Sequence, residues 1–344
     1  MRRYLPLLLI AFFVLIIVLA GSFFLPGYAD QQNPDNVPHI TVYTNLPVEP
    51  IAVLTQEYEK VQNIKVNVVS LADDALLARL KLEADNPRAD IVIADRSLLE
   101  AARKSHCLAP SASEQTDMIA ERFKNADNYW TGIWYDPIVF AANQDFLKTL
   151  PQSPAKWSDL VKDNKWRIGL TDFLAADAYA NLLYTMAAVN GENQTLDYFK
   201  KIHPKVVQYA KFLATPVRMA GMGEVDIAIA VQSEAIRYCN DNFPIQIIYP
   251  EEGTAYLLTG AGLVKGTSHA TDARQFIDWL LQDGAQVTLR INKFFFNPTN
   301  PESYLAKGIA AKNLRLFDTE VEITKEQQHR LMDRWVQTVR LGSK

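Results

Sequence analysis

The chain has 344 residues, which is more than one hydrophobic core usually organises, so we expect two lobes. Its content of 49% hydrophobic and 22% charged residues is ordinary for a globular protein. The net charge is −4, and beyond residue 29 the chain carries 33 basic and 39 acidic residues. A mildly acidic body argues against a nucleic-acid partner, which would require a basic face.

The N-terminal segment has the features of an export signal. Arg2 and Arg3 precede an apolar run over residues 5–25, and a basic start of this kind remains in the cytoplasm. The run is longer than a typical signal core and long enough to cross a bilayer, whereas residues 27–29 resemble a cleavage site. A cleaved signal peptide over residues 1–29 and a retained anchor through residues 5–25 therefore both remain open. Either one places the body in the periplasm or outside the cell, after a polar linker over residues 30–37.

The next segments predict a parallel sheet with covering helices. β-branched and aromatic residues predict strands over residues 39–46, 64–71 and 89–95. Apolar residues at helical spacing predict a helix over residues 49–62, and Asp73 or Asp74 is expected to cap another helix. Strands that alternate with helices predict a βαβ sheet with right-handed crossovers.

The middle of the chain repeats this alternation and predicts a second lobe. We expect two strands around Asp136-Pro137, within residues 132–143. The remaining predictions are a strand over residues 166–172, a helix over 173–189, a strand and helix over 224–236, a strand over 243–250 and a helical region from 272 onward. We therefore predict that the first lobe spans residues 38–137 and 250–344, and that the second lobe spans residues 138–249.

Five segments together resemble the family 1 extracellular solute-binding proteins of ABC transporters, in the branch that binds iron, phosphonates, sugar phosphates and polyamines. They are "ITVYTNLPVEPIAVLTQEYEKVQNIKVNVVSL", "LLARLKLEADNPRADIVIAD", "MGEVDIAIAVQSEA", "YPEEGTAYLLTGAGLVKG" and "ATDARQFIDWLLQDGAQ". Each motif is weak alone, but their order is specific. The resemblance runs from about residue 39 to the C-terminus.

The resemblance implies an α/β fold of the type II periplasmic binding protein class, with two lobes joined by crossing hinge strands. It implies that a monomer captures a small polar ligand in the interlobe cleft and presents it to the membrane permease of an ABC transporter. A membrane-anchored receptor that works with a sensor kinase is the alternative. We expect no enzymatic activity, because no Ser/His/acid or Cys/His arrangement lies near the predicted strand ends. Residues 249–266 would return through the hinge with residues 251–254 facing the cleft, and a surface hairpin is the alternative.

Ligands of open α/β sheets bind beyond the carboxyl ends of the strands, which selects the candidate site residues. The candidates are polar residues at those ends, at helix starts and in the hinge turn: Thr44, Asn45, Asp95, Arg96, Ser97, Thr171, Asp172, Asp177, Arg218, Glu252 and Thr254. Arg96 is the best candidate for a carboxylate or phosphate because its planar guanidinium can donate two parallel hydrogen bonds. Turn and cap roles are the alternatives for Thr44, Asn45, Asp95 and Ser97, and an ion pair with Glu224 is the alternative for Arg218.

The segment "TDFLAADAYA", residues 171–180, departs from the family pattern D-P-x-x-S-G-T of anion binders. Asp172 and Asp177 add negative charge at a helix start, where they compete with an anionic ligand. An amine-bearing or zwitterionic ligand therefore fits this segment better than a simple phosphate. We predict no metal site, because Tyr238 is followed by Cys239 where iron binders resemble a tyrosine pair, and no cofactor. Cys107 and Cys239 are expected to be separate thiols.

Overall fold

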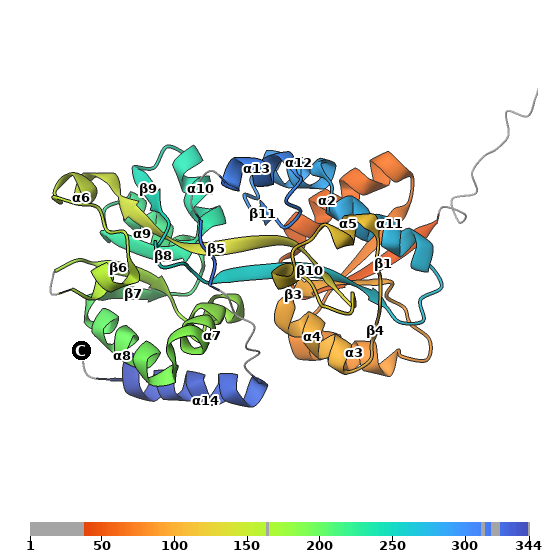
Figure 1. Cartoon of the computed structure of the whole chain (residues 1–344), viewed down its shortest axis with the longest axis horizontal. Coiled ribbons are helices and arrows are strands. Elements are labelled where there is room, and N and C mark those ends of the chain that lie inside the picture. Colours follow the sequence, from red (N-terminus) through yellow and green to blue (C-terminus); the bar gives the residue numbers. More distant parts are fainter. Residues whose placement is uncertain (1–37, 163–164, 311–313, 318–323, 343–344) are drawn as a thin grey trace, which may run out of the picture.

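The computed structural model describes residues 38–344 except 163–164, 311–313, 318–323 and 343–344. The predicted export segment and the linker over residues 30–37 therefore lie outside the described residues. Two α/β lobes lie side by side and are joined by long strands, which confirms the predicted fold class (Figure 1). Among the described helices, none is both long and apolar enough to cross a membrane.

The first lobe is built around three parallel strands. β1 pairs in parallel with β2 and with β3, and β3 pairs with the antiparallel strand β10. The elements are β1 (His39–Thr44), α2 (Val48–Gln62), β2 (Lys65–Ser70), α3 (Asp73–Leu82), β3 (Ile91–Asp95), α4 (Arg96–Lys104), β4 (Leu108–Ala109), α5 (Glu114–Asp117), η2 (Glu121–Phe123) and β10 (Tyr256–Val264). Ile51, Leu54 and Tyr58 form the buried stripe of α2, as their spacing predicts.

The second lobe has the same alternation of strands and helices. β6 is parallel to both β7 and β8, whereas β5 is antiparallel to β8 and β9. The elements are β5 (Thr131–Asn143), α6 (Gln144–Lys148), η3 (Trp157–Val161), β6 (Ile168–Thr171), α7 (Asp177–Asn190), α8 (Glu192–Ile202), η4 (His203–Lys205), β7 (Val206–Ala210), α9 (Ala214–Gly221), β8 (Ile227–Val231), α10 (Gln232–Asn240) and β9 (Ile245–Ile248).

The lobes are joined by segments that cross between them. The prediction of two strands within residues 132–143 is wrong, because β5 is one continuous strand that belongs to both halves of the sheet. Pro137 cannot donate a backbone hydrogen bond, and it lies where β5 leaves β10 and begins to pair with β8. Residues 249–256 form the return crossing into β10. Residues 314–317 form a third segment between the lobes, which pairs with the return crossing. The Thr254 carbonyl accepts from the Phe317 N–H at 2.8 Å.

The C-terminal region divides between the lobes. α11 (Ala270–Leu280) and α12 (Asp283–Ile291) contribute Phe276 and Leu289 to the core of the first lobe, near β11 (Asn297–Pro298) and α13 (Tyr304–Ala310). α14 (Lys325–Trp335) and η5 (Val336–Arg340) pack instead on the second lobe. The assignment of all residues 250–344 to the first lobe is therefore wrong. The reason is an apolar stripe of Leu331, Trp335 and Val339, which is buried in the core of the second lobe.

Candidate functional site

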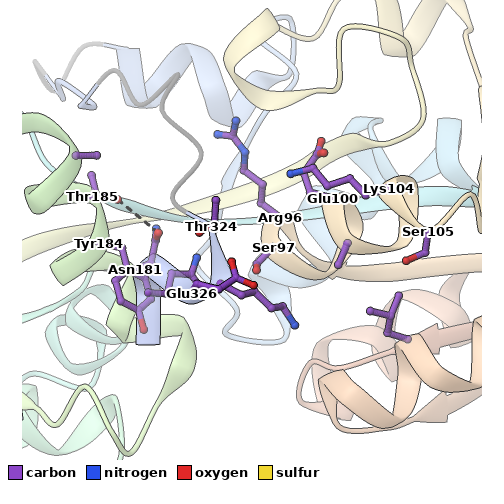
Figure 2. Close-up of a pocket in the computed structure, with 15 residues that line it drawn as sticks. Arg96, Ser97, Glu100, Lys104, Ser105, Asn181, Tyr184, Thr185, Thr324 and Glu326 are labelled. Carbon is purple, nitrogen blue, oxygen red and sulfur yellow. Dashed lines mark hydrogen bonds between the residues drawn. The ribbon is translucent and has the colours of Figure 1, made fainter. Parts of the chain in front are cut away.

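Two adjoining cavities of about 470 Å³ each lie between the lobes. Their walls come from α3 and α4, from one side of α7, from residues 256–258 of β10 and from α14. The residues common to both cavities are Arg96, Ser97, Asn181, Tyr184, Thr185, Lys325 and Gln328. Figure 2 shows the α4 and α7 residues on opposite sides, with Thr324 and Glu326 of the α14 region between them. The cavities therefore form one continuous interlobe cleft.

A polar network orders the first-lobe wall of the cleft. The amide nitrogen of Asn45 donates to Asp73 Oδ1 at 2.9 Å and also to a carboxylate oxygen of Asp95. Asp95 caps α4, since its Oδ1 accepts from the Leu98 N–H at 3.1 Å. Burial raises the pKa of Asp95 and the Asp73 carboxylate raises it further, while the hydrogen bonds from Asn45 and Leu98 lower it. This network fixes the two helix starts beside each other.

Arg96 is the first residue of α4 and lines both cavities. Its guanidinium carbon lies 5.9 Å from the centre of a Trp130 ring. The nearby carboxylate of Glu100 is engaged elsewhere, because it accepts from the Trp130 indole at 2.6 Å and from Arg103 at 2.8 Å. Within the described part of the chain, Arg96 forms no hydrogen bond or ion pair. Its guanidinium can therefore donate to an anionic ligand.

The second-lobe wall is one face of α7. Asn181, Tyr184 and Thr185 recur at helical spacing and line both cavities. The Asn181 side chain donates to the Tyr256 carbonyl at 2.7 Å, which ties this wall to the β10 floor. The Thr185 hydroxyl lies 3.4 Å from Asn181 Oδ1 (Figure 2). Sequence reasoning missed this face, although three polar residues at helical spacing in an apolar helix are a signal that could have indicated it.

Of the candidates predicted in the first lobe, the structure brings Asp95, Arg96 and Ser97 to the cleft. Asn45 does not line the cavities but donates hydrogen bonds to the carboxylates of Asp73 and Asp95, which do. Thr44 is fully buried, and its hydroxyl oxygen accepts from the Leu46 N–H at 3.1 Å. Its place therefore matches the turn role and not the ligand-binding role.

Three candidates predicted in the second lobe, Thr171, Asp172 and Arg218, do not line these cavities. Thr171 is fully buried, and its hydroxyl has no partner within the described residues. Asp172 forms an ion pair of 3.1 Å with Arg340. Arg218 lies outside the cleft and is 3.7 Å from Glu224, its alternative partner. The side chain of Asp177 lies outside the described part of the structure.

The expectation that residues 251–254 face the cleft is wrong. Glu252 turns toward the second lobe, where its carboxylate accepts from the Trp157 N–H at 3.3 Å. Thr254 is fully buried and donates its hydroxyl to the Ile138 carbonyl at 2.7 Å. The turn is therefore used to hold the hinge, and the strand after it, residues 256–258, supplies the floor of the cleft.

The described residues contain neither a disulfide nor a cluster of side chains that could hold a metal ion. Cys107 and Cys239 are separate thiols, as predicted, and burial raises the pKa of both. No group of three or more histidine, cysteine, aspartate or glutamate side chains in this part of the chain could hold a metal ion.

Replacing Asp172 with Asn is expected to lower the free energy of unfolding by about 1 kcal/mol, because the partly buried pair with Arg340 is lost. Affinity for amine-bearing ligands should not change, since Asp172 lies outside the cavities. Urea unfolding and calorimetric titration with ethanolamine measure both quantities. A weakened affinity with unchanged unfolding would contradict the structural role.

The chain matches known proteins over most of its length. A model of the bacterial extracellular solute-binding proteins matches residues 86–311. The chain is 26% identical to a probable ABC transporter periplasmic-binding protein, y4fP, of Sinorhizobium fredii, over 96% of this chain and 91% of the relative. It is 23% identical to a putative 2-aminoethylphosphonate-binding periplasmic protein of Salmonella typhi, over 67% and 68% of the two chains. Other relatives are named for iron uptake and for thiamine binding.

The solved structures agree with the fold. The periplasmic binding protein AfuA of Actinobacillus pleuropneumoniae, solved with fructose 6-phosphate, superposes with a TM-score of 0.71 at 24% identity. The match covers 88% of this chain and 99% of AfuA. The predicted resemblance is thereby confirmed, and the chain belongs to the bacterial extracellular solute-binding proteins of ABC uptake systems.

Proposed function

We propose that the protein binds a small zwitterionic solute in the interlobe cleft, with the anionic group of the ligand at Arg96 and its ammonium group beside Asp73 and Asp74. The observation that carries this proposal is the state of Arg96, which lines both cavities without a carboxylate partner among the described residues. A guanidinium in that state favours a carboxylate, phosphonate or phosphate ligand.

The acidic side of the same wall supports the second half of the proposal. Asp73 and Asp74 begin α3 and line the cavity that Arg96 shares. Asp74 is 99% exposed, and the ammonium group of Lys325 lies 3.8 Å away. Carboxylates and an unpaired guanidinium that line the same cavity give the cleft both charges, as a zwitterion requires. Asp172 does not add to this acidic wall, because its carboxylate is paired with Arg340.

The names of the relatives are consistent with this ligand class. One relative is named for 2-aminoethylphosphonate, which carries an amine and a phosphonate, and AfuA was solved with a sugar phosphate. We retain the uptake role over the sensor-kinase alternative because the relatives are named as periplasmic transport components. We further propose that the protein acts as a monomer and releases its ligand unchanged.

Export is the remaining part of the proposal. We propose that residues 1–29 direct this chain across the membrane, which places the cleft on the side where the permease receives its substrate. Intact-mass measurement of the protein isolated from its host distinguishes a chain cleaved near residue 29 from one anchored through residues 5–25.

Calorimetric titration with a zwitterion and with analogues that each carry one of its charged groups tests the zwitterion hypothesis. 2-Aminoethylphosphonate is expected to bind more tightly than ethylphosphonate or ethanolamine, each of which carries only one of its charges. Replacing Arg96 with Ala should lower the affinity for 2-aminoethylphosphonate roughly tenfold to a hundredfold, because hydrogen bonds to a charged group are lost. Arg218→Ala is the matched control, since it removes an arginine outside the cleft, and it should bind normally. Unchanged affinity in the Arg96→Ala variant would contradict the proposal.

A further inference from the structure

We propose that α14 is a third wall of the ligand site and that its Lys325 acts with Arg96 to select ligands with a doubly charged anionic group. This inference rests on the proposed anionic site at Arg96. Both cations line both cavities. They come from different lobes, since Arg96 begins α4 of the first lobe and Lys325 begins the helix that packs on the second.

The sequence of α14 divides the helix into separate faces. Lys325, Gln328, His329 and Met332 recur at positions i, i+3, i+4 and i+7, and all four line the second cavity. The apolar stripe of Leu331, Trp335 and Val339 is turned toward the second-lobe core. The helix therefore turns its apolar stripe to the core and presents the polar side chains of Lys325, Gln328 and His329 to the cleft.

α14 is held firmly enough to act as a wall. Glu192 at the start of α8 accepts from Arg330 at 2.8 Å and from Arg334 at 2.6 Å. Both arginines hold the pKa of Glu192 below its usual range. At the other end, Thr324 and Gln327 form a reciprocal capping box, so the first turn that carries Lys325 is well defined. The position of Lys325 is therefore fixed relative to the second lobe.

The ion pair that Lys325 now makes is easily exchanged. Its ammonium group lies 3.8 Å from Asp74 Oδ1, and the two side chains are 51% and 99% exposed. Exposed pairs at this distance contribute little free energy. A phosphonate has three acceptor oxygens and more than one negative charge at neutral pH, so it can accept from Arg96 and Lys325 together. A singly charged sulfonate gains less from the second cation.

The test compares 2-aminoethylphosphonate with taurine, its sulfonate analogue, by calorimetric titration of the full-length protein. These probes share the amine and the two-carbon spacer and differ in the charge of the anionic group. Lys325→Ala is expected to lower the affinity for 2-aminoethylphosphonate about tenfold and the affinity for taurine about twofold. The ratio of the first affinity to the second should therefore fall about fivefold. Asp74→Asn, which releases Lys325, should not lower that ratio. A purely structural effect of the substitution would weaken both probes equally.

Lys200→Ala is the matched control, because Lys200 also lies on a second-lobe helix and pairs with an exposed aspartate, Asp197, at 3.4 Å. It lies outside the cavities and should leave both affinities unchanged. If Lys325→Ala leaves the ratio unchanged while Arg96→Ala weakens 2-aminoethylphosphonate, the role of α14 is overturned and the proposed function stands. If neither 2-aminoethylphosphonate nor taurine binds the unaltered protein, both proposals are overturned.

Discussion

Replacing Trp335 with Ala is expected to lower the free energy of unfolding by about 3–5 kcal/mol, the usual range when a buried tryptophan is truncated. Trp335 is fully buried in the second-lobe core. Its ring centre lies 5.0 Å from that of Phe173 and 5.9 Å from that of Tyr209. Truncation would leave a cavity beneath α14 and remove the main apolar contact of the C-terminal helix. Urea unfolding followed by circular dichroism measures the change.

Trp335→Phe separates packing from hydrogen bonding at this position. The indole N–H has no hydrogen-bond partner within the described residues, so its removal loses no bond, and the phenyl ring preserves most of the contact. This variant should lose much less stability than Trp335→Ala. Leu341→Ala is the surface control, because Leu341 is 68% exposed, and it should change the unfolding free energy by less than about 0.5 kcal/mol. Similar small changes in all three variants would show that α14 does not belong to this core.

The parts of the fold that sequence predicted well are those with local signals. The strands over residues 39–46, 64–71 and 89–95 alternate with helices of clear periodicity, and parallel pairing follows from that order. Arg96 was found for a related reason, because it directly follows a buried strand in a fold that binds ligands at strand ends. For the first-lobe strands and for Arg96, the order of elements along the chain was sufficient to make the prediction.

The errors have a common physical cause, because each depended on contacts distant in sequence. Nothing local shows that Asp172 meets Arg340, 168 residues further on. The stripe of Leu331 and Trp335 shows that α14 buries one side, but it does not show which lobe receives it. Glu252 and Thr254 resemble cleft residues by composition, whereas their partners Trp157 and Ile138 are elsewhere in the chain.

Asp136 in the hinge strand is expected to make stability fall as pH rises from about 4 to 7. The carboxylate is 5% exposed and accepts from the Ser233 N–H at 2.9 Å and from the Ser233 hydroxyl at 2.5 Å, at the start of α10. The pKa of Asp136 is raised from 3.8 to about 7; burial is the largest cause and Glu234 adds to it, while the hydrogen bonds from Ser233 act in the opposite direction. In that window the folded protein keeps a proton that the unfolded chain has lost. The stability from this group is complete below about pH 4 and is lost above about pH 7.

Asp136→Asn should remove this dependence, because an amide resembles the protonated carboxyl and does not titrate. The unfolding free energy of the variant relative to the unaltered protein should therefore rise by up to about 4 kcal/mol between pH 4 and pH 8. Urea unfolding at unit pH steps measures it, with Asp145→Asn as a control at an aspartate that is 77% exposed. Parallel pH profiles for Asp136→Asn and the unaltered protein would contradict the prediction. If the unfolding free energy of the variant rises relative to that of the unaltered protein as pH increases, the buried carboxylate that connects β5 to α10 also makes the hinge region sensitive to pH.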